Sequence, residues 1–544
     1  MLLAGSTALP SWHIALLLAP AVTAFAAAAA VTAGSRTGST TTAWRMARAA
    51  SVVMVVAAVV GAIVRAATSE RAGALVRSDT IGVTMALLVS LVAWAVVRYS
   101  QAYLAGDPCE RRYIGRLLAT IGAVAVVIVA NHLVELVVAW AATSLAMHGL
   151  LEFFGDRPVA IAVAHKKFVL ARCADLSMLG AVVAFGTTFH TLRIERIVAD
   201  ATTSAALPAG GRVGIALVAL AAVLKCAQLP FHGWLIQVME APTPVSALLH
   251  AGVVNLGGFV LLRFAPVVDR ATETRTLLVI VGASTAVVAA LVMTTRISIK
   301  VSLAWSTCAQ MGFMLMQCGL GLWEMAMLHL LAHSLYKAHA FLSAGGVVRQ
   351  TQRKQLAAEP DAPTAASVTI AASVALAGTL AAGWLWGKLP FSEPPSATLI
   401  VMTGIVGLAL VPLITDITQP GGRRARTALV IGTIAVPLTY FALHDLFGHF
   451  VHHGPAAPPA LLVFVAASFT LLFAVRASSA IAPAGRVSQH LYPWIYGGLF
   501  IDEAFTRVVF AIWPPPPTRA RPALLPQITA TPVPARTHAD RSLA

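Results

Sequence analysis

Long apolar runs recur along the whole chain and limit its possible fold more strongly than any other feature. A run of about 18 or more apolar residues is long enough to cross a bilayer as an α-helix. Only 11% of the 544 residues are charged and 58% are hydrophobic, whereas soluble domains carry about 25% charged residues. The sequence therefore predicts an all-α polytopic membrane protein and excludes a soluble globule with an ordinary surface.

The apolar runs predict about fifteen transmembrane helices. We place them at residues 12–33, 48–67, 79–98, 114–130, 132–154, 167–189, 210–228, 241–263, 275–294, 299–319, 322–347, 364–387, 396–415, 427–444 and 458–476. The predicted regions are N-terminal helices at 1–110, an ion-translocation core at 111–350 and C-terminal helices at 351–487. The amphipathic segment 488–513 is predicted to lie in the membrane interface or to dock on a partner. The Pro/Arg-rich tail 514–544 is predicted to be disordered.

The positive charge of the chain lies mainly in short predicted loops. The formal net charge is +16, and we assign Lys166, Lys167 and Arg172 to such a loop on the cytoplasmic side. Lys and Arg accumulate in the cytoplasmic loops of membrane proteins, which explains the charge better than binding to nucleic acid. We therefore predict a multi-pass protein of the plasma (cell inner) membrane, with its N-terminus outside and its C-terminus cytoplasmic.

Ionisable residues inside the predicted spans are the main candidates for function. A charged side chain at membrane depth costs about 2.5–3.5 kcal/mol on insertion scales, and such residues usually have a functional role. Lys225 follows a long apolar stretch and precedes Pro230, which removes a backbone donor and breaks a helix. Broken helices at membrane depth line cavities or ion paths. Alternatively, Lys225 extends from a helix end to the lipid headgroups.

A second motif places a histidine inside an apolar helix. Pro242 and Pro244 suit the first turn of a helix after a break in the chain, and His250 lies six residues beyond Pro244. An imidazole exchanges protons through either nitrogen near neutral pH, so His250 is a candidate proton carrier. A structural histidine that hydrogen-bonds a neighbouring helix is the alternative.

The third motif is His329-x-x-x-His333-x-x-x-Lys337, whose spacing places three titratable groups on one helix face. At about 1.5 Å per residue they form a column about 12 Å long, which suits a water-bridged proton relay. Zinc binding and a purely structural role are the alternatives. No third zinc ligand is evident and the five cysteines form no C-x-x-C pair, so we predict no metal in this chain.

Acidic residues are candidate partners of the buried lysines. Glu135 lies within a predicted span, and Asp175 lies near the start of the next one. A carboxylate opposite a buried lysine lets that lysine hold or release its proton as the pair forms and breaks. Lys388 is a candidate exit residue or, alternatively, an ordinary loop lysine. We place a histidine cluster in a solvated outer loop: His444, His449, His452 and His453.

Three long motifs resemble the antiporter-like subunits of respiratory complex I and of Mrp Na⁺/H⁺ antiporters. They are K-x-A-Q-x-P-x-H-x-W…E-x-P-T-P-V-S-A-L-x-H-A over 225–251, I-x-I-K-x-x-L-A-x-S-T-x-x-Q-x-G-x-M over 297–314, and H-L-L-A-H-S-L-Y-K-A-x-x-F-L-x-A-G over 329–345. The resemblance implies inverted repeats and broken helices. It makes Lys225 the central lysine, His250 the connecting histidine and the 329–337 column part of a second half-channel.

This resemblance has two departures at individual residues. Complex I subunits carry a glutamate directly after the tryptophan of the fifth span, whereas Ala141 follows Trp140 here. Glu135 is the candidate substitute, although it projects about 240° around the helix from Ala141. Lys388 matches the exit lysine of the family, but its usual S-K-D-E surroundings are missing.

Two further segments resemble the DabB family, the membrane subunits of Dab inorganic-carbon accumulation complexes. They are W-A-A-T-S-L-A-M-H-G-L-L-E-F-F at 140–154, followed by H-K-K-F-V-L-A-R, and L-Y-P-W-I-Y-G-G-L-F-I-D-E-A-F-T-R at 491–507. This resemblance implies a subunit that conducts H⁺ or Na⁺, with H⁺ expected. Its partner would be DabA, a soluble zinc protein similar to β-carbonic anhydrase, so we expect zinc in the partner and no cofactor in this chain.

Two other functions stay open at this point. One is a proton-pumping subunit of an NADH-quinone oxidoreductase or of a related Mrp or hydrogenase complex. The other is a solute transporter or membrane scaffold whose polar residues only pack helices. Neither alternative gives this chain a catalytic reaction of its own, so we do not expect an enzyme.

Overall fold

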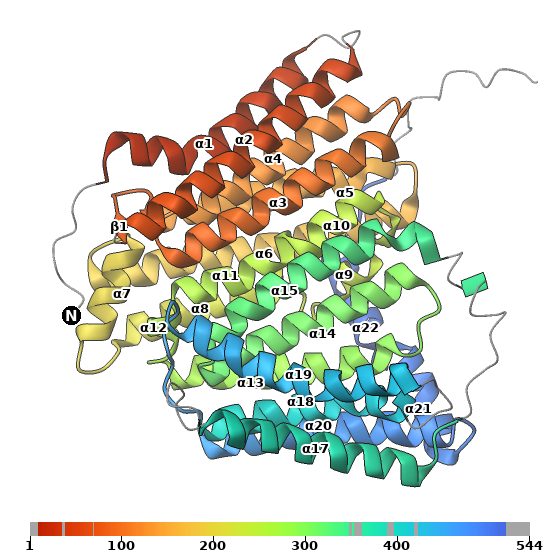
Figure 1. Ribbon diagram of the computed structural model, residues 1–544. Coiled ribbons are helices and arrows are strands. Elements are labelled where there is room, and N and C mark those ends of the chain that lie inside the picture. Colours follow the sequence, from red (N-terminus) through yellow and green to blue (C-terminus); the bar gives the residue numbers. More distant parts are fainter. Residues whose placement is uncertain are drawn as a thin grey trace, which may run out of the picture.

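The computed structural model describes residues 9–34, 39–68, 70–347, 351–352, 362–388, 396–417 and 423–517. The described residues are mainly helical, with one short β-hairpin (Figure 1). Most of the tail predicted to be disordered lies outside this described part.

The all-α polytopic fold is confirmed. Each predicted span coincides with a helix or with a pair of short helices. Ten segments of the described chain are long and apolar enough to cross a membrane. The other predicted spans coincide with α8 (Ala209–Lys225), α14 (Ile299–Leu320), α15 (Trp323–Leu342), α18 (Ala397–Ile417) and α19 (Arg423–Gly448).

Four helices and the hairpin form an N-terminal bundle, coloured red to orange in Figure 1. They are α1 (Ser11–Ala33), α2 (Thr40–Ala67), β1 (Arg71–Ala72), β2 (Arg77–Ser78), α3 (Thr80–Tyr103) and α4 (Glu110–Val129). The helix α1 packs against α2 and α4 largely through buried alanines such as Ala24 and Ala28. Small side chains let helices approach closely where lipid supplies no hydrophobic driving force between them.

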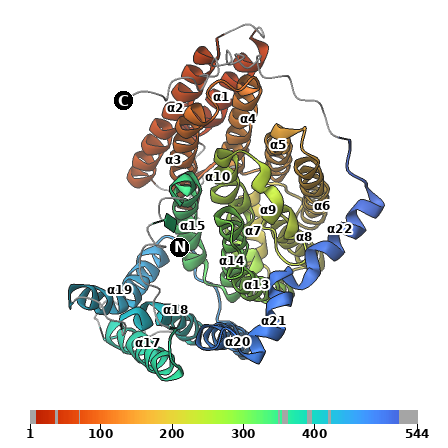
Figure 2. The same ribbon diagram turned by 90° about the vertical axis from the view of Figure 1, so that its right-hand side faces the viewer.

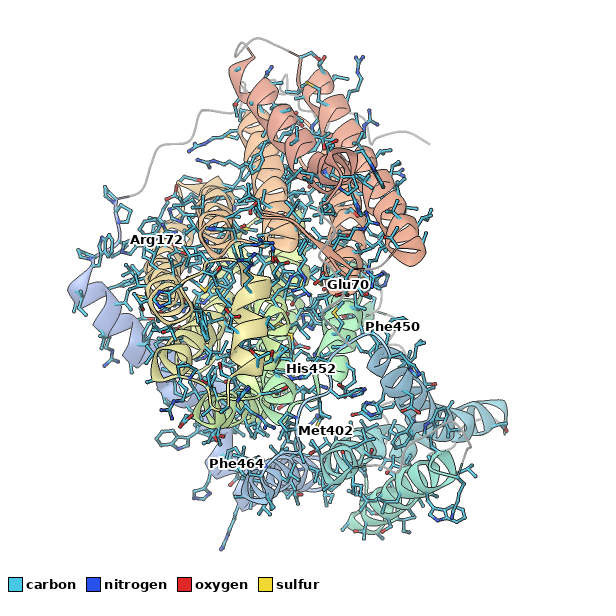
Figure 3. The ribbon with its side chains drawn as sticks, turned by 90° about the vertical axis from the view of Figure 1, so that its left-hand side faces the viewer. Glu70, Arg172, Met402, Phe450, His452 and Phe464 are labelled. Carbon is cyan, nitrogen blue, oxygen red and sulfur yellow. The ribbon has the colours of Figure 1, made fainter. Side chains whose placement is uncertain are left out.

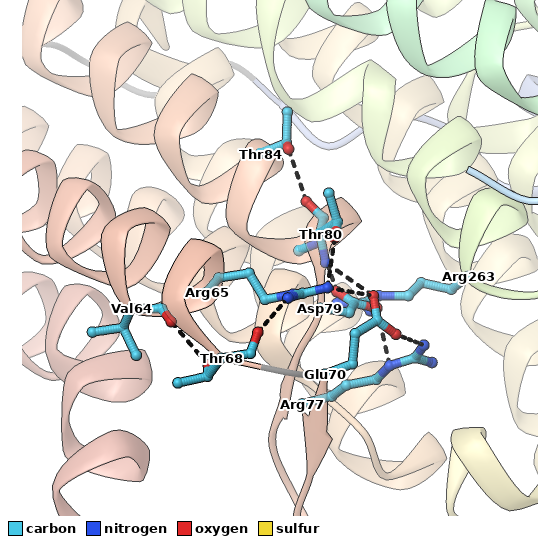
Figure 4. A network of polar contacts seen from close by, with 10 residues as sticks. Val64, Arg65, Thr68, Glu70, Arg77, Asp79, Thr80, Thr84 and Arg263 are labelled. Atoms are coloured by element: carbon cyan, nitrogen blue, oxygen red, sulfur yellow. Dashed lines mark hydrogen bonds and ion pairs between the residues drawn. The ribbon is translucent and has the colours of Figure 1, made fainter. Parts of the chain in front are cut away.

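A buried ion-pair network joins this bundle to the core (Figure 4). Asp79 accepts a hydrogen bond from the Gly82 N–H and so caps α3, and it pairs with Arg77 at 2.9 Å and with Arg263. The side chains of Asp79 and Arg263 are 3% and 1% exposed. Burial acts to raise the pKa of Asp79, but the guanidinium groups of Arg263 and Arg77 outweigh it and hold that pKa below its usual range.

The middle of the chain forms a core with interrupted spans. Besides α8, α14 and α15 it contains α5 (Leu133–Leu151), η1 (Glu152–Phe154), α6 (Pro158–Phe189), α7 (Ile194–Thr203), α9 (Gly233–Gln237), η2 (Val238–Glu240), α10 (Thr243–Ala251), η3 (Val253–Asn255), α11 (Leu256–Arg263), α12 (Ala265–Val268), α13 (Thr272–Met293) and η4 (Ala344–Gly346). The helices α13 and α14 cross at Gly282 and Gly312. A Cβ on either glycine would lie within 2.6 Å of the other's carbonyl oxygen, so these two backbones touch directly.

The C-terminal helices lie beside the core and are followed by a peripheral segment (Figure 2). The helices α17 (Ala365–Trp386), α18, α19 and α20 (Pro459–Ile481) pack on one another. The chain then runs back along α13 and α6 through α21 (Arg486–Tyr496), η5 (Gly498–Phe500) and α22 (Ile501–Ile512). We call residues 486–513 the C-terminal strap.

The C-terminal strap is held on the core by a buried ion pair. Lys166 Nζ lies 2.9 Å from Asp502 Oδ1 and 3.0 Å from Gln237 Oε1, and Gln237 Nε2 donates to Asp502 Oδ2 at 2.7 Å. Gly233 lies so close that a Cβ there would overlap the Asp502 carboxylate. The strap, which includes the predicted amphipathic segment, therefore docks on the core of its own chain.

The loop prediction for Lys166, Lys167 and Arg172 is wrong. The helix α6 begins at Pro158, nine residues before the predicted span, because proline suits the first turn of a helix. All three residues therefore lie within α6, and Lys166 and Lys167 are 1% and 4% exposed. Both ammonium groups donate to oxygen atoms inside the protein, so neither needs to reach the headgroups.

Candidate functional site

The first interruption follows Lys225, the last residue of α8. The chain leaves the helix at Cys226, passes Pro230 and re-enters a helix at α9. Side chains of neighbouring helices satisfy the freed backbone groups. The Leu229 N–H donates to Thr285 Oγ1 at 3.1 Å, and the Cys308 thiol donates to the Ala227 carbonyl at 3.2 Å. Irregular backbone at membrane depth is tolerated only with such internal partners.

Two buried lysines converge on Ser144 at this interruption. Lys225 Nζ donates to Ser144 Oγ at 2.8 Å and lies 4.5 Å from the centre of the Trp140 ring. Lys167 Nζ donates to the Ser144 carbonyl at 2.6 Å. Lys225 is 6% exposed and Lys167 is 4% exposed. The arrangement places two ammonium groups on the two oxygen atoms of one residue, the Ser144 hydroxyl and the Ser144 carbonyl.

Sequence reasoning missed both Lys167 and Ser144. Two signals were available. Ser144 lies four residues after Trp140, on the same face of α5, and Lys167 lies inside the apolar stretch A-V-A-H-K-K-F-V-L. Lys225 itself does not extend to a headgroup, because its ammonium group hydrogen-bonds inside the protein.

The second interruption lies at Gly252, within the span predicted at 241–263. Pro242 and Pro244 stand at the start of α10 and begin that helix, while the break inside the span comes after His250. The backbone of Gly252 leaves the helical conformation (φ −130°, ψ −68°) before η3 and α11 resume. The prolines therefore mark a helix start, and glycine supplies the break that sequence reasoning missed.

The histidine of this interruption faces the column on α15. His333 Nε2 lies 3.3 Å from the His250 carbonyl oxygen, and the His250 ring stacks on Phe341 at 4.5 Å between ring centres. The rings of His329 and His333 are 6.0 Å apart. Lys337 is fully buried, and its Nζ lies 3.3 Å from the Leu303 carbonyl oxygen. The three residues of the third motif thus form a continuous column beside His250.

The candidate acids form no direct ion pair with Lys225, Lys167 or Lys337 in the described part of the chain, although the Asp175 carboxylate interacts electrostatically with Lys225 and Lys167. Asp175 forms an ion pair with Arg172 at 2.7 Å on α6. Glu135 lies in the first turn of α5, nine residues or about 13 Å along the helix from Ser144. In the described part of the chain Glu135 forms no ion pair with a lysine. Ala141 follows Trp140, and the direct hydrogen-bond partner of Lys225 on α5 is the neutral hydroxyl group of Ser144.

The remaining candidates are Lys388, which follows α17, and the histidines at and after the end of α19. Lys388 is exposed after α17, with Nζ 5.5 Å from the centre of the Trp384 ring, and residues 389–395 lie outside the described part. His444 lies in α19, so its assignment to a solvated outer loop is wrong. Its Nδ1 is 3.1 Å from the buried Glu324. His452, labelled in Figure 3, lies in the connection after α19, and its Nε2 is 2.8 Å from Asp269 Oδ2.

Comparisons with known proteins show the family and the fold of the chain. Residues 130–360 match the model of the NADH:quinone oxidoreductase/Mrp antiporter transmembrane family, and residues 73–114 match the complex I chain 5 N-terminus family. The chain is similar in fold to a chain of the Mrp complex from Dietzia (TM-score 0.55, 23% identity, covering 91% of this chain and 56% of that one). It also resembles a chain of an archaeal membrane-bound sulfane sulfur reductase (TM-score 0.56, 15% identity, covering 92% and 99%).

Fold and site together define an antiporter-like membrane subunit of a multi-subunit complex. Among curated proteins, the chain is 38% identical to a probable inorganic carbon transporter subunit DabB of Hydrogenovibrio crunogenus, covering 83% of this chain and 86% of that protein. It is 36% identical to DabB2 of Halothiobacillus neapolitanus, covering 81% and 80%. The chain belongs to the DabB family. An NADH-quinone oxidoreductase subunit L of Mycobacterium tuberculosis is 35% identical over 51% of this chain and 44% of that protein.

Proposed function

We propose that the chain is the proton-conducting membrane subunit of an energy-coupled inorganic-carbon accumulation complex. Its partner would be a DabA-like zinc subunit similar to carbonic anhydrase, which would hold the only metal and carry out CO₂ hydration. The names of the Hydrogenovibrio and Halothiobacillus relatives, probable inorganic carbon transporter subunits, support the substrate class. The buried lysines at Ser144 and the His329–His333–Lys337 column beside His250 support the ion-conducting role.

The observation that carries this proposal is how the buried lysines are held. Lys167, Lys225 and Lys337 each donate to a neutral oxygen atom, and none of them forms an ion pair within the described residues. Asp175 interacts electrostatically with Lys167 and Lys225 but pairs directly with Arg172, and removing an ammonium group from water without a direct ion pair is costly. Such a cost is usually retained at membrane depth only where an ion or a proton moves.

The geometry suggests how the two interruptions cooperate. A proton that leaves the Lys225 and Lys167 pair would pass toward His250, whose span packs against α15. His333 is next to His250, and the column ends at Lys337. Backbone breaks at Cys226 and Gly252 leave polar groups between these positions, where water can bridge them. We further propose that the N-terminus lies outside and the C-terminus in the cytoplasm.

A growth assay with matched variants tests the proposal. The chain is expressed together with a DabA-like partner in a bacterium that lacks carbonic anhydrase and needs added CO₂. We expect Lys225→Met and Lys337→Met to abolish growth in air without reducing the amount of chain in the membrane. Lys300→Met, at a half-buried lysine in the first turn of α14, serves as the control. Growth in air of both relay variants would contradict the proposal.

The partner is tested separately by co-purification. We expect the tagged chain to retain a large soluble subunit, with zinc measured in the complex by elemental analysis. The rival function, a subunit of an NADH-quinone oxidoreductase, rests on the identity to subunit L over half of the chain. It predicts co-purification with iron–sulfur subunits and rotenone- or piericidin-sensitive quinone reduction in place of a zinc protein.

A further inference from the structure

A polar cavity of about 550 Å³ opens where α15 begins, outside the relay described above. Its wall is formed by the start of α15, the end of α17, α18, α19 and the following residues up to 454. Figure 3 shows His452 and Phe450 on this connection between the core and the C-terminal helices. The titratable residues that line the cavity are Glu324, His444, Asp445, His449 and His453.

Glu324 is the deepest titratable group of the cavity. Its side chain is 1% exposed, its Oε1 lies 3.1 Å from His444 Nδ1 and its Oε2 lies 3.9 Å from His453 Nδ1. His444 is 18% exposed and His453 is 63% exposed. The buried carboxylate therefore lies between two imidazoles, one beside each oxygen atom, and His453 connects it to solvent.

The neighbouring acids are occupied by other donors. Asp445 accepts a hydrogen bond from Trp386 Nε1 at 2.8 Å, and Asp269 accepts from Trp323 Nε1 at 3.0 Å and pairs with His452. Glu324 Oε2, in contrast, has no hydrogen-bond partner among the described residues. A buried carboxylate oxygen without a hydrogen bond is costly, and here it is next to an imidazole that reaches solvent.

Glu324 also lies next to the relay column. It is in the first turn of α15, five residues before His329, which corresponds to about 7.5 Å along the helix axis. The two side chains project about 140° apart around α15, so transfer between them requires a bridging water. The cavity is thus placed at the end of the column that lies farthest from Lys337.

We propose that Glu324, His444 and His453 form a proton-loading site at the mouth of the α15 column, and that the ion passed there is H⁺ and not Na⁺. This inference rests on the proposed relay function. In the loading step, His453 imidazolium gives its Nδ1 proton to Glu324 Oε2 through a bridging water, which spans the 3.9 Å between the two atoms. Neutral His453 and a neutral carboxylic acid result, and the acid then releases the proton through water toward the column.

The donor set favours a proton over a sodium ion. Alkali and alkaline-earth cations prefer oxygen ligands such as backbone carbonyls and carboxylates. The two basic side chains within 4 Å of the Glu324 carboxylate are both imidazoles, which exchange protons near neutral pH. Tyr440, one turn before His444 on α19, also has a buried hydroxyl without a partner among the described residues.

Proton uptake by the complete complex in sealed membrane vesicles tests the site. We expect Glu324→Gln to lower the rate of H⁺ flux at least tenfold, and Glu324→Asp to restore part of it. The control is Glu273→Gln, in the first turn of α13, where the carboxylate is 73% exposed. We expect its flux to stay within twofold of the unmodified chain. Because His453 is on the surface, His453→Gln is expected to fold normally and to raise the proton concentration needed for half-maximal flux.

The outcomes separate this site from the relay itself. If Lys337→Met abolishes flux while Glu324→Gln and His453→Gln both behave like Glu273→Gln, the loading site is overturned and the relay stands. If Lys337→Met keeps full flux, the proposed relay function is contradicted, and the loading site that rests on it is overturned as well. If Glu324→Gln lowers ²²Na⁺ uptake as strongly as H⁺ uptake, the assignment of the ion to H⁺ is overturned.

Discussion

Replacing Asp502 with asparagine would measure how firmly the C-terminal strap is held. Removing one partner of a fully buried ion pair costs about 3–5 kcal/mol. The expected cost is lower here because Asp502 is 15% exposed and Lys166 keeps Gln237 Oε1 at 3.0 Å as an acceptor. We therefore expect Asp502→Asn to lower the free energy of opening the strap by about 2–3 kcal/mol. At about 1.4 kcal/mol per factor of ten, local protection should fall roughly 30- to 150-fold.

Hydrogen–deuterium exchange of the purified chain in detergent or lipid nanodiscs measures the free energy of opening the strap. Peptides covering 486–513 should exchange faster in Asp502→Asn, while peptides of α13 and α14 should not change. Glu503→Gln is the matched control, because Glu503 is adjacent in the strap but exposed. Exchange of the strap within threefold of the unmodified chain in Asp502→Asn would refute the idea that this ion pair holds it.

Three further predictions follow from buried contacts. Ser144→Ala removes the hydroxyl that accepts from Lys225, and a hydrogen bond to a charged group is worth about 1.5–3 kcal/mol. We expect H⁺ flux through Ser144→Ala to fall about tenfold or more, and flux through Ser144→Thr to stay close to normal. Equal fluxes in Ser144→Ala and in the unmodified chain would contradict a role of this hydroxyl in conduction. Asp79→Asn leaves a buried guanidinium without its counter-charge, and SDS titration should show a loss of about 3–5 kcal/mol in the free energy of unfolding. Because the folded pKa of Asp79 is lowered, its stabilisation is complete above the unfolded pKa of about 3.9 and is lost as pH falls through the folded value. Asp79→Asn should lack this acid-dependent loss. Gly312→Ala should lower the free energy of unfolding by about 1–3 kcal/mol, because the added methyl group overpacks the α13–α14 crossing. Gly345→Ala should have little effect, because Gly345 faces open space. Similar losses of stability in both variants would contradict the close backbone contact at this crossing.

Local patterns in the sequence were sufficient for the membrane fold and for several positions of the proposed relay. The length of an apolar run depends only on consecutive residues, so all predicted spans could be placed before any helix packing was known. The spacing of His329, His333 and Lys337 likewise fixes one helix face, and Pro230 predicts an interruption because a proline inside a helix removes a backbone donor and clashes with the preceding turn.

Only the tertiary structure decided which of these groups meet. Ser144 is 23 residues from Lys167 and 81 from Lys225, while Lys166 and Asp502 are 336 residues apart. Periodicity does not reveal such contacts in a membrane protein, because the faces that touch lipid and the faces that touch other helices are both apolar. The sequence determined that buried basic residues exist, and the packing of distant helices determined which oxygen atoms hold them.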